Sequence, residues 1–81
     1  MNSLIIKSMT NSMLKNIIET INHELKNGLI YVVIEDDYNY YKSYEPITIY
    51  NDSEEISIHD EDDNHITLPL KVVESIKIAE I

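Results

Sequence analysis

Residues 11–35 read NSMLKNIIETINHELKNGLIYVVIE, and this stretch predicts a helix that leads directly into a strand. In residues 11–26 the apolar side chains recur every three or four positions, as in an amphipathic helix, at Met13, Leu14, Ile17, Ile18, Ile21 and Leu25. Asn22 falls on the opposite side, which should face the solvent. Gly28, the only glycine, stands where a left-handed helix stop is expected. Residues 29–35 are apolar and largely β-branched, so we expect a strand that is central or covered on both faces.

The middle of the chain predicts a loop followed by a meander. Residues 36–46 contain four tyrosines and end at Pro46, and we expect a long loop there. Apolar and polar residues then alternate in three short segments, which predicts strands at residues 47–50, 54–59 and 65–68. In the second of these strands Ser57 and His59 should face the solvent.

The two ends of the chain complete the expected fold. Residues 70–80 predict a final helix, because apolar side chains lie at helical spacing at Val72, Val73, Ile76 and Ala79. Residues 1–9 fit either an extra edge strand or a lead-in to the first helix. We therefore expect an α+β fold of order α-β-β-β-β-α, with an N-terminal and a C-terminal helix on one face of an antiparallel sheet of about four strands. The 81 residues make a single domain, residues 1–81.

The negative charge of the chain lies in its middle. The net charge is −9, and residues 35–64 hold eleven carboxylates against the single cation Lys42. Residues 1–34 carry +1 and residues 65–81 are neutral. Such a field repels nucleic acid and anionic membranes, and it attracts a basic protein surface. We therefore expect a basic protein partner and no direct contact with nucleic acid or membrane.

The composition disfavours catalysis. The chain has no cysteine and no arginine, and its single glycine excludes a glycine-rich phosphate loop. No serine lies in a nucleophile elbow, and no cofactor motif is present. We predict a binding protein rather than an enzyme, with no cofactor. The apolar run near the N-terminus is too short for a signal peptide or a membrane span, so we expect the cytoplasm.

Two alternatives stay open. Asp60, Asp62 and Asn64 match the start of a calcium-binding EF-hand loop, but His65 and Lys71 replace its required Gly and Glu. With His59 and His65 beside them, these residues define a second hypothesis, a divalent-cation-binding domain. A third hypothesis is a homo-oligomeric structural module, such as a homodimer joined through a strand edge or through a helix face marked by Ile78 and Ile81.

The main candidate is a partner-binding surface made of acidic and tyrosine residues. Tyrosine offers a large contact area at low entropic cost, and carboxylates on alternate residues of a strand lie about 6.6–6.8 Å apart, close to the spacing of nucleic-acid phosphates. The candidate residues are Glu35, Asp36, Asp37, Tyr38, Tyr40, Tyr41, Tyr44, Glu54, Glu55, Asp60, Glu61, Asp62 and Asp63.

In its short length, acidic middle, tyrosine-rich loop and helix–meander–helix layout, the chain resembles the small acidic proteins of phages that inhibit host defence, anti-CRISPR proteins among them. The resemblance rests on no motif and extends over the whole chain. It implies a DNA mimic that occupies the basic DNA-binding cleft of a host defence nuclease, in the host cytoplasm.

Overall fold

The structure is a computed structural model that describes residues 2–4, 9–50 and 54–81, with the backbone alone for residues 2–4. These residues contain one α-helix, a 3-10 turn and seven strands. In chain order the elements are β1 (Asn2–Leu4), α1 (Asn11–Lys26), β2 (Ile30–Glu35), β3 (Tyr40–Ser43), β4 (Thr48–Tyr50), β5 (Glu55–His59), β6 (His65–Pro69), the 3-10 turn (Leu70–Val72) and β7 (Ser75–Glu80). The expected α+β class is confirmed.

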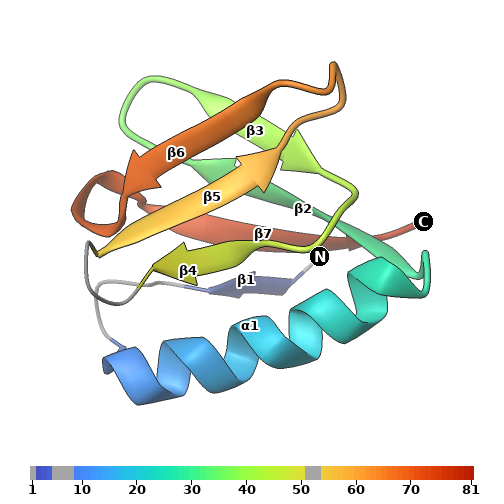
Figure 1. Ribbon diagram of the computed structural model, residues 1–81, viewed down its shortest axis with the longest axis horizontal. Coiled ribbons are helices and arrows are strands. Elements are labelled where there is room, and N and C mark those ends of the chain that lie inside the picture. Colours follow the sequence, from blue (N-terminus) through green and yellow to red (C-terminus); the bar gives the residue numbers. More distant parts are fainter. Residues whose placement is uncertain (1, 5–8, 51–53) are drawn as a thin grey trace.

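The strands form two antiparallel sheets rather than one. The first sheet has the order β1-β7-β2-β3, and the second has the order β4-β5-β6. Figure 1 shows the second sheet in front of the first, with α1 running along the bottom of both. Between these layers lies one apolar core, made by Leu14, Ile18, Ile21, Leu25, Ile30, Val32, Ile34, Ile47, Ile56, Ile58, Val73 and Ile76.

The first helix begins and ends where the sequence predicts. The Thr10 side chain caps its start by accepting a hydrogen bond from the Met13 N–H (3.2 Å). At its end the N–H groups of Gly28 and Leu29 donate to the carbonyls of Leu25 and Glu24, both at 3.1 Å. This is a Schellman ending, and it requires the left-handed backbone that Gly28 adopts, with φ +72°. Met13, assigned to the apolar stripe, is exposed.

Asn22 has a different place from the one expected. Its side-chain amide donates to the Ile47 carbonyl and accepts from the Ile47 N–H, both at 2.7 Å. The amide thus copies the pairing of a neighbouring strand and fastens α1 to the segment before β4. The helical periodicity assigned Asn22 to the solvent because the period says nothing about what packs beside the helix.

The predicted C-terminal helix is wrong. Only Leu70–Val72 are helical, as a 3-10 turn, and Ser75–Glu80 form β7. This strand pairs with β2 on one side and β1 on the other, so that Ile76 and Ile78 lie opposite Ile34 and Val32. Pairing of β7 with two neighbours satisfies backbone groups that a short helix would leave unmatched in β2, so the tertiary context overrides the helical spacing.

Four further expectations are decided by the two sheets. β2 lies between β7 and β3, so the central strand is confirmed, and its alternate residues are buried. The expected loop over residues 36–46 instead contains β3, which pairs with β2. Asn2–Leu4 form the edge strand β1, one of the two alternatives for residues 1–9, and residues 5–8 lie outside the described part. The meander is confirmed as β4, β5 and β6.

Candidate partner-binding surface

Most carboxylates of the acidic stretch lie in turns, not in rows along strands. On the outward face of β5, Glu55 is followed by Ser57 and His59, so no row of carboxylates forms there. On the outward face of β2 the one carboxylate, Glu35, is bound by the Lys77 ammonium at 2.7 Å. The phosphate-like spacing expected along strands is therefore not formed within the described strands.

The turn between β2 and β3 is shaped by Asp36. Its carboxylate accepts hydrogen bonds from the backbone N–H groups of Tyr38 (2.8 Å) and Asn39 (2.6 Å). These bonds, that from Tyr38 first, lower the pKa of Asp36 below its usual value of 3.8. Tyr38 at the tip of the turn is 92% exposed. Asp36 therefore serves mainly to hold the turn, and Tyr38 is the side chain that it presents.

The turn between β5 and β6 is also held by an aspartate that accepts backbone hydrogen bonds. The Asp60 carboxylate accepts from the backbone N–H groups of Asn64 (2.8 Å) and Asp62 (3.0 Å). The bond from Asn64 is the main cause that lowers the pKa of Asp60. Asp63 adopts a left-handed backbone, with φ +64°. The result is a fixed tip on which the side chains of Glu61, Asp62 and Asp63 are exposed.

Beside this turn lies a hollow that we call the acidic corner. Its volume is about 310 Å³, and it is lined by Tyr44, Glu45, His59, Asp60, Glu61 and Asp63. The Glu45 carboxylate and the His59 Nδ1 are 3.8 Å apart. The structure thus brings Glu45 next to carboxylates that follow it by fifteen or more residues in the chain. A cationic side chain can enter here between carboxylates and an aromatic wall.

The tyrosines divide between the core and the surface. Tyr41 is half-buried and packs against the core, so only part of its side chain is open to a partner. Tyr40 is 68% exposed. Tyr44 stacks on Tyr31, with ring centroids 5.2 Å apart, and the Lys42 ammonium lies 5.7 Å from the Tyr31 ring. Tyr31 was missed, although its outward position in the alternation of β2 could have identified it.

The remaining candidate carboxylates lie elsewhere. Glu54 and Glu55 line a separate hollow of about 260 Å³ together with Pro69 and Lys71. The length of β5, about 17 Å from Glu55 to Asp60, separates this hollow from the acidic corner. In Figure 1 the β2–β3 turn lies at the upper left and the β5–β6 turn at the upper right. Among the described residues, the candidate carboxylates are therefore divided among separate places on the molecule.

The histidines of the meander contact each other across the β5–β6 pair. The rings of His59 and His65 stack with centroids 5.0 Å apart. His65 Nε2 is hydrogen-bonded to the Ser57 hydroxyl, which also accepts from Thr67 (3.4 Å). Ser57 is only 3% exposed, contrary to its expected outward position, because these neighbours cover it. Within residues 9–50 and 54–81, no group of three or more metal-ligating side chains is assembled.

In the part of the chain that the structure describes, no helix is long and apolar enough to cross a membrane. Comparison with protein-family models, curated proteins and solved structures gave no match to this chain.

Proposed function

We propose that this protein is a protein-binding inhibitor or adaptor that docks its acidic corner on the basic, nucleic-acid-binding surface of another protein. The observation that carries the proposal is the gathering of Glu45 with Asp60, Glu61 and Asp63 around one hollow beside Tyr44. Two chain segments converge there, and a turn held by Asp60 keeps the carboxylates in place.

The charges of the corner are available to a partner. Among the described residues no lysine forms an ion pair with a corner carboxylate, and the one ion-pair contact given for Glu45 is with the His59 imidazole, at 3.8 Å. Uncompensated carboxylates steer a basic partner during encounter and fix its orientation. Nucleic acid itself is repelled by the same field.

Tyr44 supplies the anchor. An aromatic ring that is partly exposed and already ordered loses little entropy on binding, and such rings are common interface hot spots. The stack with Tyr31 holds the Tyr44 ring at the rim of the corner. The contact therefore combines steering by carboxylates with an ordered apolar surface.

The class of partner follows from the charge and from the resemblance to phage inhibitors of host defence. In our proposal the carboxylates of the corner occupy positions that DNA phosphates take in a nuclease of the host cytoplasm. They do so from two chain segments, one of which is the β5–β6 turn, and not as a row along a strand.

The test is capture of proteins from the native host with the immobilised protein, with duplex DNA as competitor. One variant combines Glu45→Gln, Glu61→Gln and Asp63→Asn, and a matched control combines Glu19→Gln, Glu54→Gln and Glu55→Gln. Each removes three negative charges, so only the location of the charges differs.

We expect the wild type and the control to capture a nucleic-acid-binding protein that DNA displaces, and the corner variant to retain little of it. A partner held equally well by both variants, or indifferent to DNA, would contradict the proposal.

A further inference from the structure

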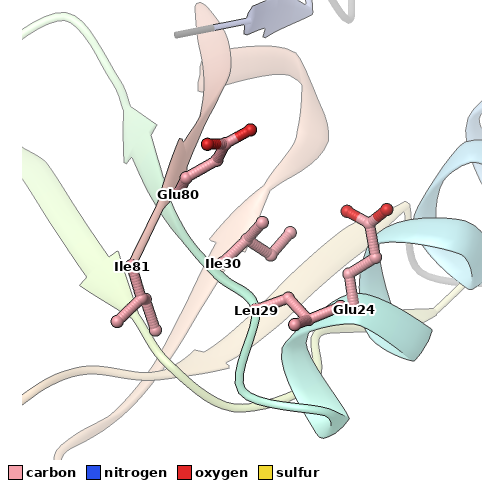
Figure 2. Close-up of a pocket in the computed structure, with 5 residues that line it drawn as sticks. All are labelled: Glu24, Leu29, Ile30, Glu80 and Ile81. Atoms are coloured by element: carbon pink, nitrogen blue, oxygen red, sulfur yellow. The ribbon is translucent and has the colours of Figure 1, made fainter.

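A second hollow, which we call the end pocket, lies where α1 ends and β7 ends. Its volume is about 340 Å³, and it is lined by Glu24, Leu29, Ile30, Glu80 and Ile81. Figure 2 shows the Ile30 side chain between the two glutamates, with both carboxylates directed to the same side. Aliphatic and acidic groups therefore surround one small space.

The pocket is built by the helix ending and the sheet. The Schellman turn directs the chain outward at Leu29, whose carbonyl accepts a hydrogen bond from the Ile81 N–H (3.1 Å). Ile30 lies opposite Glu80 in the β2–β7 pair. Ile30 is buried, but Leu29 and Ile81 are 57% and 72% exposed. The apolar walls are thus fixed in position and uncovered.

The two carboxylates have no cationic partner within the described residues. Glu24 also lies in the last turn of α1, where the helix dipole disfavours a negative charge. A cationic group bound beside Glu24 would offset this unfavourable position.

We propose that the end pocket binds a lysine or arginine side chain of a protein partner. The aliphatic stem of that side chain covers Leu29, Ile30 and Ile81, and its charged head reaches Glu24 and Glu80. Long basic side chains commonly bury their stems on apolar surface in this way. An apolar ligand would desolvate both carboxylates without pairing them, and an anionic ligand would be repelled.

This inference extends the proposed function, because the end pocket and the acidic corner lie in the same half of the molecule. In Figure 1 the end of α1, the C-terminal end and the β5–β6 turn all lie on the right. Both sites therefore lie toward the same end of the longest axis of the molecule. The volume of the end pocket is near the lower limit for small-molecule sites, which suits a single side chain.

The test uses the free protein and two blocked peptides, acetyl-Gly-Gly-Arg-Gly-Gly-amide and the same peptide with Gln in place of Arg. Amide chemical shifts are followed by NMR during titration of the wild type, of Glu24→Gln/Glu80→Gln, and of the matched control Glu19→Gln/Glu55→Gln. We expect the Arg peptide to shift Leu29, Ile30 and Ile81 in the wild type and in the control. The pocket variant should bind at these residues at least about threefold more weakly.

Equal shifts with the Gln peptide, or no weakening in the pocket variant, would overturn the inference. Failure here differs from failure of the proposed function, because shifts at Glu61 and Asp63 report the acidic corner in the same spectra. Glu24→Gln alone should also raise the melting temperature by about 1 to 5 °C, since it removes an unfavourable charge from the helix end. A fall in the melting temperature would show that Glu24 stabilises the free protein and would contradict the argument.

Discussion

Replacement of Asn22 by Ala should cost this domain a large part of its stability. The Asn22 amide makes two hydrogen bonds of 2.7 Å to the backbone of Ile47, whose side chain is buried in the core. Loss of two such bonds, with their backbone partners left poorly solvated, costs about 2–3 kcal/mol. The higher helix propensity of Ala returns about 0.6 kcal/mol. Since a domain of this size has about 4–12 kcal/mol of stability, the net loss is readily measured.

The assay is urea unfolding followed by circular dichroism, with Asn16→Ala as the matched control. Asn16 lies on the exposed side of the same helix, so its replacement reports the propensity gain alone. We expect the free energy of unfolding of Asn22→Ala to lie about 2–3 kcal/mol below that of the control. If the two variants were equally stable, the hydrogen bonds between Asn22 and Ile47 would not contribute to stability as proposed. Because Ile47 follows Tyr44 and Glu45 closely, the same variant should also loosen the acidic corner.

Three further predictions concern the turns and the aromatic stack. The pKa values of Asp36 and Asp60 are lowered below 3.8 by backbone hydrogen bonds. The stability that these carboxylates contribute is therefore present above about pH 4 and is lost as the pH falls through the lowered values. In Asp36→Asn/Asp60→Asn the free energy of unfolding should vary less with pH in this acidic range, and an unchanged pH dependence would refute the prediction. Gly28→Ala should destabilise by about 1 kcal/mol in thermal unfolding, because φ is +72° although nothing lies within 4 Å of the added methyl; an unchanged melting temperature would show that the helix ending tolerates the side chain. A double-mutant cycle with Tyr31→Leu and Tyr44→Leu should give a coupling energy of about 0.5–1.5 kcal/mol, and additive losses would mean that the stack contributes nothing.

The sequence predicts well the elements whose signals are local. The apolar stripe of α1 and the glycine that ends it determine the helix, and the largely apolar, β-branched run over residues 29–34 determines β2. The alternation of isoleucines determines the meander. In each case the period of the apolar residues and the turn chemistry agree, so neighbouring residues alone carry the information.

The elements predicted wrongly depend on distant partners. The spacing of Ile76 and Ile78 fits a strand as well as that of Val73 and Ile76 fits a helix. The segment becomes a strand because its backbone pairs with β1 on one side and with β2 on the other. The same holds for β3, which is a strand because β2 offers it an edge. Local periodicity cannot choose between such alternatives.

The candidate site was predicted as one surface, but the structure divides its carboxylates among separate places. The acidic stretch was identified, yet the structure separates Glu54 and Glu55 from Asp60 and Glu61 along β5. Glu45 lies beside the β5–β6 turn only because of the path that the chain takes from β3 to β4. The same is true of Glu24 and Glu80, which are far apart in sequence and lay outside the acidic stretch.

The central claim is that carboxylates of the acidic corner contact a basic partner surface. Its most direct test is the dissociation constant of the captured partner, measured at low and high salt for the wild type, the corner variant and the matched control. We predict that neutralising the corner weakens binding by about tenfold or more and reduces its salt dependence, whereas the control behaves as the wild type. A dissociation constant that is insensitive to salt and the same for both variants would contradict it.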